Sequence, residues 1–232
     1  IRAVRIDREQ RCDDLPSIGS GPCVADPMTA ADTRALLQRT GLWTRLPASI
    51  RDVVEATEAG HEPETPKPGD AAFASVQTLI ISSNRLALEA AARRATELGL
   101  ASEIVSEPLA GEARTAGASV AATLRNYSQA RQTQVRARPC VIWGGETTVT
   151  LGDASGLGGR SQELALAAAQ TLAGSEGASL LAGGTDGRDG PTDAAGAIVD
   201  GTTWGKIAAS GHDPARHLAR HDAYAALAAA GA

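Results

Sequence analysis

The sequence has few aromatic residues, few cysteines and no long apolar run. Aromatic residues make up 3% of the 232 positions, and the cysteines are Cys12, Cys23 and Cys140. An odd number of cysteines without metal-site spacing favours reduced thiols, so we expect a cytoplasmic protein. No segment approaches the ~20 apolar residues of a membrane span, and residues 1–5 are not a signal peptide. We therefore expect no membrane association.

Charge gives equally little reason to expect a polyanionic partner. The chain has 22 Lys and Arg against 27 Asp and Glu, a net charge of −5. Proteins that bind nucleic acid neutralise its phosphates with an excess of basic side chains. We therefore expect no nucleic-acid partner and a small-molecule ligand instead, and a homo-oligomer is possible. Because the sequence starts at Ile1 without a methionine, we also expect a fragment of a longer protein.

The order of apolar runs and breakers predicts an α/β fold with a mostly parallel sheet and flanking helices. Residues 61–69 contain three prolines and indicate a linker. No element can be assigned to residues 1–12. The predicted strands are 76–82, 102–105, 139–143 and 179–182, with a hairpin strand at 147–151. The predicted helices are 30–40, 47–59, 84–98, 111–127, 160–172, 202–210 and 214–230.

A pair of glycines, Gly144 and Gly145, follows the predicted strand 139–143 and precedes Glu146. Two glycines allow the backbone to approach a ligand closely, and the neighbouring carboxylate favours a functional turn over an ordinary hairpin. Ser82 and Asn84 lie where the helix 84–98 begins. Such side chains either cap the helix or bind a ligand at its N-terminus, and the sequence leaves both readings open.

The stronger signal is Gly158-Gly159-Arg160, directly before an Ala- and Leu-rich helix. At a helix N-terminus, both the helix dipole and a guanidinium group favour an anion. The alternative is a surface arginine behind a flexible loop. The pattern is neither a Walker loop nor a Rossmann fingerprint, so the glycines alone are weak evidence.

Three carboxylates lie within eight residues after the strand 179–182. They are Asp186, Asp189 and Asp193, with Gly187 and Gly190 between them. Such carboxylates can bind Mg²⁺, or one can take a proton from a substrate hydroxyl. If they act in this way, they should be exposed at the carboxyl end of the strand. Asp and Gly also simply form turns, which is the alternative.

Seven motifs, taken in order, resemble the glycerate 2-kinase family of the MOFRL type, also called hydroxypyruvate reductase-associated glycerate kinase. They are residues 14–22, 65–70, 82–84, 111–114, 144–149, 159–163 and 184–197. The resemblance runs from about Asp13 to the last residue. The chain departs from the family at residues 8–12, which lack the usual segment, and at Ser161, where asparagine is usual.

The resemblance implies ATP-dependent, Mg²⁺-assisted phosphorylation of D-glycerate to 2-phosphoglycerate in a cleft between two α/β domains. It implies that residues 1–70 are the remnant of a first, Rossmann-like domain with the linker. Residues 71–232 would be the second α/β domain, with the MOFRL region at 138–232. Most of the first domain, including a lysine expected to contact phosphate, is absent, so we expect the 232-residue chain to be inactive.

By matching motifs, the resemblance implies that the catalytic residues are Arg160, Glu146 and Asp189, with Arg160 neutralising phosphate charge. The implied metal ligands are Asp186 and Asp193. The implied substrate- and nucleotide-binding residues are Ser82, Asn84, Gly144, Gly145, Gly158, Gly159, Asp186, Gly187 and Gly190. The division of roles among the four carboxylates stays open. Three alternatives remain: a kinase for another small hydroxy acid, a non-catalytic module that binds small anions or nucleotides, and a decayed relic of the same fold.

Overall fold

The computed structural model describes residues 2–7, 15–16, 21, 23–79, 82–130, 138–152 and 156–232. For residues 2–7 and 128–130 it describes the backbone but not the side chains. The chain forms two compact units, one of Ile1–Cys12 with Ser82–Ala232 and one of Asp13–Ile81. The larger unit therefore takes residues from both sides of the predicted boundary at residue 70. The origin of residues 1–70 in another domain stays a prediction.

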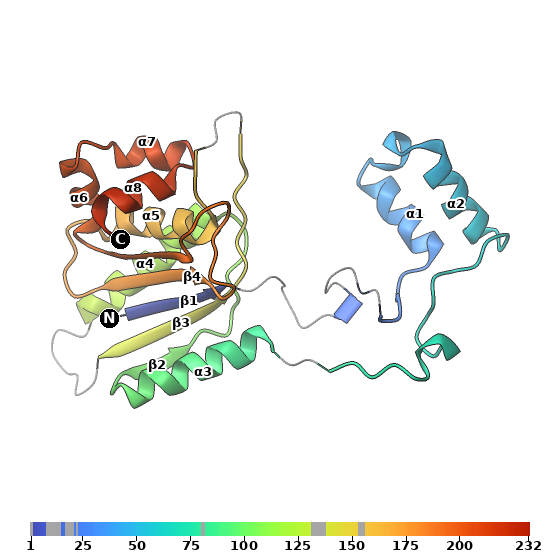
Figure 1. Cartoon of the computed structure of the whole chain (residues 1–232), viewed down its shortest axis with the longest axis horizontal. Coiled ribbons are helices and arrows are strands. Elements are labelled where there is room, and N and C mark those ends of the chain that lie inside the picture. The colour runs from blue at the N-terminus through green and yellow to red at the C-terminus, as the bar shows by residue number, and fades with distance from the viewer. Residues whose placement is uncertain are drawn as a thin grey trace. The chain divides into compact units, whose positions relative to one another are not determined.

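The larger unit is built on a five-stranded sheet (Figure 1). Its strands are β1 (Arg2–Asp7), β2 (Ala101–Ile104), β3 (Pro139–Gly145), β4 (Ser179–Gly184) and β5 (Gly196–Asp200). Their order is β2-β3-β1-β4-β5. β1 pairs in parallel with β3 and β4, and β2 pairs in parallel with β3, whereas β5 is antiparallel to β4. The predicted α/β class with a mostly parallel sheet is confirmed.

Helices cover both faces of this sheet. They are α3 (Asn84–Glu97), α4 (Ala113–Ala130), α5 (Arg160–Leu172), α6 (Thr203–Ala209), α7 (Pro214–Ala219) and α8 (Ala223–Ala230). Figure 1 shows α3 on one side of the sheet and the other five helices on the opposite side. The alternation of side chains along β3 explains this arrangement. Cys140 and Ile142 pack with Ala95 of α3, while Val141 and Trp143 join the large core formed with α4 and α5.

α4 and α5 cross so closely that their backbones touch. A Cβ added to Gly117 of α4 would lie 2.2 Å from the carbonyl oxygen of Leu164 in α5. Only glycine allows this approach, so the position is fixed by packing and not by backbone dihedral angles.

We expect Gly117→Ala to lower the free energy of unfolding by about 3 kcal/mol, because the helices must separate to admit the methyl group. Urea unfolding measures this change. The matched control is Gly205→Ala in α6, where an added Cβ meets nothing within 4 Å. That variant should be neutral or more stable by up to about 1 kcal/mol. Equal destabilisation of the two variants would contradict the close crossing.

The smaller unit contains α1 (Ala30–Arg39) and α2 (Ala48–Glu58), with 3₁₀ turns at Trp43–Arg45 and Ala71–Phe73. Thr29 and Asp32 form a capping box at the start of α1. Hydrogen bonds from the hydroxyl and backbone of Thr29 lower the pKa of the Asp32 carboxyl. The N-terminus of this helix is thus defined by its own sequence.

Most predicted elements are confirmed within a few residues. The confirmed helices are those predicted at 30–40, 47–59, 84–98, 111–127, 160–172 and 202–210, and the confirmed strands are those at 102–105, 139–143 and 179–182. No described helix is both long enough and apolar enough to cross a membrane.

Two predicted strands are wrong where the structure describes them. Residues 76–79 and 82 do not form a strand, although Val76 to Ser82 is rich in β-branched residues. Leu79 is 81% exposed, so its side chain is not packed in a core. Residues 147–151 form only a single bridge, between Thr148 and Glu112, because the chain runs alongside the segment that precedes α4.

The sequence also misses one helix break and two strands. The single helix predicted over 214–230 is divided at His221, which has a left-handed φ of 56°. The break follows from a tertiary contact, since the Asp222 carboxylate accepts a hydrogen bond from the distant Leu157 N–H at 2.9 Å. The two missed strands, β1 and β5, are each six residues or shorter.

Candidate active site

The parallel strands β3 and β4 end at the same edge of the sheet, where ligands bind in open α/β folds. β3 ends with Gly144 and Gly145, directly before Glu146, and β4 ends before the Asp loop, residues 185–195. The helix that begins with Arg160 also starts here, because the Asp loop contacts its first turn. Most of the predicted site residues therefore lie at one edge.

Glu146 is held by a second chain segment that runs beside it. Its N–H donates to the carbonyl of Leu109 at 3.0 Å. The N–H of Thr148 donates to the carbonyl of Gly111 at 2.7 Å, and that of Ala113 to Thr148 at 2.8 Å. A Cβ on Gly145 would lie 2.3 Å from the Leu109 oxygen, so glycine is required for this close approach. The segment 109–113 thus fixes the backbone from which the Glu146 side chain projects.

Arg160 and Glu146 form an ion pair between Nη1 and Oε1. The side chains are 36% and 25% exposed, so both charges still reach water. Partly exposed ion pairs of this kind contribute little to stability and can exchange partners. The structure therefore brings together the two residues to which the resemblance gives catalytic roles.

Asp189 has a different setting from the one expected. It is only 4% exposed, so the expectation that this carboxylate is exposed is wrong. Its Oδ1 accepts from the N–H of Ser161 at 3.0 Å and its Oδ2 from that of Gln162 at 2.7 Å. The carboxylate thus occupies the anion-binding position at the N-terminus of α5. Its catalytic role stays a prediction, and these contacts favour a structural one.

Glycines permit the Asp loop to pack against the start of α5. A Cβ on Gly159 would lie 2.3 Å from Cγ of Asp189, and one on Gly190 would lie 2.5 Å from the carbonyl oxygen of Gly158. Gly190 also has a left-handed φ of 62°. By contrast, a Cβ on Gly187 meets nothing within 4 Å, although its φ of 81° still favours glycine. Gly159 and Gly190 are therefore needed for packing at this junction.

Asp186 and Asp193 are both exposed. Each accepts a hydrogen bond from a neighbouring protein group. Oδ1 of Asp186 accepts from the N–H of Arg188 at 3.1 Å, and Oδ1 of Asp193 accepts from the hydroxyl of Tyr224 at 2.7 Å. The latter bond raises the pKa of the Tyr224 hydroxyl. Across the described residues, no three His, Cys, Asp or Glu side chains gather to hold a metal. The roles of Asp186 and Asp193 as Mg²⁺ ligands therefore stay a prediction.

The predicted residues before α3 divide between capping and packing. Ser82 is exposed, and Ser83 caps the helix by accepting from the N–H of Leu86 at 3.2 Å. A Cβ added to Gly144 would lie 2.6 Å from both Nδ2 and Oδ1 of Asn84, so the Asn84 amide packs directly against this glycine. Within the described structure, Asn84 Oδ1 and Gln162 Oε1 are buried without a hydrogen-bond partner. Such unpaired polar atoms are uncommon and are expected more often at functional sites.

A polar cluster formed by residues of α4, α5 and the turn between α7 and α8 has no predicted role. Arg114, Glu163 and His221 contact one another, and Leu218 and Glu112 lie close to them. Hydrogen bonds from the hydroxyl and N–H of Thr150 lower the pKa of the Glu112 carboxyl. Arg114 and Glu163 occur within the motifs that carry the family resemblance, which was the only signal available for them.

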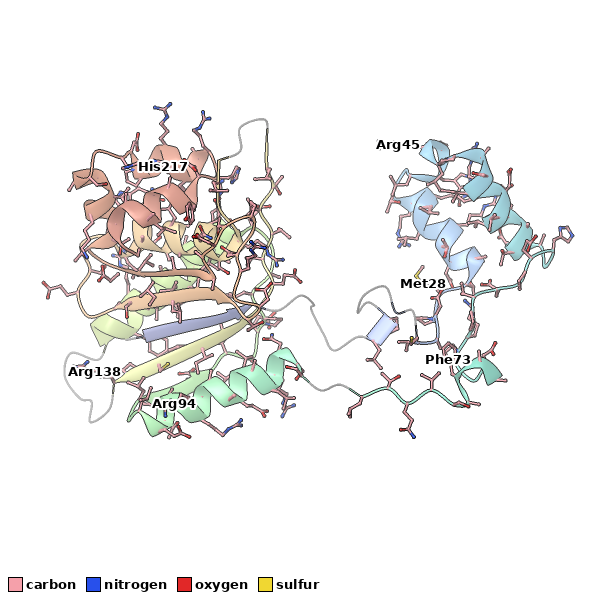
Figure 2. The ribbon with its side chains drawn as sticks, viewed as in Figure 1. Met28, Arg45, Phe73, Arg94, Arg138 and His217 are labelled. Carbon is pink, nitrogen blue, oxygen red and sulfur yellow. The ribbon has the colours of Figure 1, made fainter. Side chains whose placement is uncertain are left out.

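The turn between α7 and α8 holds the glycine loop, residues 156–159, that leads into α5. The N–H of Gly156 donates to the carbonyl of Arg220 at 2.7 Å, and Leu157 N–H donates to Asp222 as described above. A Cβ on Gly156 would lie 2.2 Å from Cβ of Asp222. Asp222 also lies 2.9 Å from Nδ1 of His217, which Figure 2 labels on α7. The path of the loop is therefore set by this turn.

Residues 139–232 match the MOFRL family, and residues 11–55 match a family described as a domain of unknown function (DUF4147). A glycerate 2-kinase of Pyrococcus horikoshii is 39% identical over 220 residues, covering 93% of this chain and 48% of the relative. A D-glycerate 2-kinase of Thermotoga maritima is 37% identical, covering 95% and 49%. A relative from Agrobacterium vitis with the provisional name hydroxypyruvate reductase is 40% identical, covering 94% and 48%.

A solved structure of a glycerate kinase from Thermotoga maritima superposes with a TM-score of 0.74 at 35% identity, covering 99% of this chain and 52% of that one. The chain thus spans about half the length of the curated relatives it matches. By its motifs, its relatives and its fold, the chain belongs to the glycerate 2-kinase family, and residues 139–232 form its MOFRL domain.

Proposed function

We propose that the protein to which this chain belongs transfers a phosphoryl group from ATP to D-glycerate, giving 2-phosphoglycerate. The observation that carries the proposal is the ion pair of Arg160 and Glu146 at the carboxyl edge of the sheet. The names of the relatives support the choice of glycerate as acceptor. A reduced, cytoplasmic setting is part of the same proposal.

In the proposed reaction, an anionic group of the substrates replaces Glu146 as the partner of Arg160. The oxygen of the glycerate 2-hydroxyl attacks the γ-phosphorus of ATP, and the bond from that phosphorus to the bridging oxygen of ADP breaks. Glu146, released from the arginine, takes the hydroxyl proton. Arg160 neutralises charge on the transferred group, which is the main requirement of phosphoryl transfer.

The phosphates of the nucleotide would meet the arginine and not the amides at the start of α5. The backbone N–H groups of Ser161 and Gln162 already donate hydrogen bonds to the Asp189 carboxylate. Mg²⁺ would neutralise further phosphate charge when bound. Asp186 and Asp193 stay the predicted residues that would hold it, together with substrate phosphates and water.

The test is an assay of the longest protein that contains this chain with ATP, Mg²⁺ and D-glycerate, in which ³¹P NMR identifies the product. We expect 2-phosphoglycerate. A second reaction with hydroxypyruvate and NADH examines the name given to the Agrobacterium relative. Oxidation of NADH without phosphorylation of glycerate would overturn the proposal. Binding of ATP or glycerate without turnover would favour the non-catalytic module.

We also expect the 232-residue chain by itself to be inactive in the same assay. It spans about half of its kinase relatives. In-line transfer needs both substrates aligned, and a misplacement of about 1 Å can cost roughly a hundredfold in rate. Clear formation of 2-phosphoglycerate by this chain alone would show that all the groups needed for catalysis lie within it.

A further inference from the structure

Glu163 is a buried carboxylate that the proposed reaction does not use. Its side chain is 3% exposed. Its Oε1 lies 2.9 Å from Nη2 and 3.2 Å from Nε of Arg114, and 3.1 Å from Nδ1 of His221. A buried charge is stable only when it is paired and hydrogen-bonded, so these contacts are needed to keep the carboxylate in place.

The three residues come from the three segments that hold the ion pair of Arg160 and Glu146. Arg114 is in the first turn of α4, directly after the segment 109–113 that fixes the backbone of Glu146. Glu163 lies one turn after Arg160 in α5. His221 is in the turn that holds the glycine loop. Glu163 therefore joins the supports of both charged side chains and of the loop between them.

The backbone at His221 is consistent with this function. Among the described residues it is the one non-glycine residue with a positive φ. A strained conformation of this kind is unfavourable and persists only where surrounding contacts enforce it. Nδ1 of His221 also lies 3.0 Å from Nη2 of Arg114. Nη2 of Arg114 also donates to Glu163 Oε1 and, at 3.3 Å, to the carbonyl of Leu218.

We infer that Glu163, together with Arg114 and His221, is a positioning residue that sets the distance and orientation of Arg160 relative to Glu146. The inference rests on the proposed kinase function for its catalytic consequence. Its structural content is independent of that function, because it concerns only how the three segments are joined.

The decisive variant is Glu163→Gln, which keeps the shape of the side chain and removes its charge. In the longest protein that contains this chain, we expect kcat to fall by about ten- to a hundredfold, because Arg160 moves from its position. The KM values for ATP and D-glycerate should change much less. Amide hydrogen exchange should become faster at residues 145–148 and 156–162.

A matched control distinguishes positioning from loss of stability. Asp200 ends β5, and its carboxylate accepts from the N–H and hydroxyl of Thr202 in the turn before α6. It pairs with Ser179 at the opposite end of β4 from the candidate site. Asp200→Asn should therefore lower the melting temperature without changing kcat or hydrogen exchange at those two segments.

Two further variants keep the inference testable if Glu163→Gln does not fold. Arg114→Lys removes the forked contact, and His221→Asn keeps a residue that tolerates a left-handed backbone. Both should lower kcat and speed exchange at the same segments. If the protein has no kinase activity, the proposed function fails and the exchange data alone decide the inference. Unchanged exchange at both segments, or an unchanged kcat in an active enzyme, would overturn it.

Discussion

Replacing Arg160 with alanine should lower kcat by at least about a hundredfold, with little effect on stability. The guanidinium would neutralise charge that grows in the transition state, and the loss of one such contact costs about 3 kcal/mol or more. Its ion pair with Glu146 is partly exposed, so its removal should change the free energy of unfolding by less than about 1 kcal/mol. Steady-state kinetics at saturating ATP and D-glycerate, with urea unfolding in parallel, measure both quantities.

The control for this prediction is Arg94→Ala. Arg94 lies near the end of α3 (Figure 2) and also pairs with a glutamate, Glu97, on an exposed surface. It lies in the last turn of α3, whereas the first residue of that helix packs against Gly144 at the candidate site. This variant should keep the wild-type kcat. If Arg160→Ala were as active as Arg94→Ala, the arginine would have no role in catalysis.

The second large effect is expected at Asp189, and it concerns stability. Asp189→Ala should lower the free energy of unfolding by about 3 kcal/mol, because two buried amides at the start of α5 lose their acceptor. Asp189→Asn keeps one carbonyl oxygen and should lie between this variant and the wild type. The comparison is Asp186→Ala, which removes one exposed turn contact and should cost less than about 1 kcal/mol.

The same experiment distinguishes the two readings of Asp189. A residue that acts only as a base would, when replaced, reduce turnover without changing the unfolding curve. If Asp189→Asn unfolded like the wild type and yet lost turnover, the contacts with Ser161 and Gln162 would be of secondary importance. The original catalytic assignment would then stand.

Local sequence patterns predicted much of the larger unit because its main elements are marked by breakers. The helix predicted at residues 160–172 is α5, Arg160–Leu172, since Gly158 and Gly159 interrupt the chain immediately before it. β1 was missed because its short run, Arg2–Asp7, mixes charged and apolar residues without strict alternation in a charged region. Its central place depends on pairing with β3 and β4, which lie more than a hundred residues away.

The candidate site was predictable only where the fold class determines it. Parallel strands end at one edge, so the residues after β3 and β4 had to lie near each other. The capping of α5 by Asp189 joins residues 28 positions apart, and the bond from Arg114 to Glu163 joins residues 49 apart. Such partners have no local signal, because many aspartates and glutamates in the chain satisfy the same local rules.

The most direct measurement is a crystal structure of the longest protein that contains this chain, bound to ADP and 2-phosphoglycerate. We expect the phosphate of the product to lie within hydrogen-bonding distance of the Arg160 guanidinium, with the ion pair to Glu146 opened. Asp189 should remain on the amides of Ser161 and Gln162. Product bound elsewhere, with the pair of Arg160 and Glu146 intact, would contradict the proposed site.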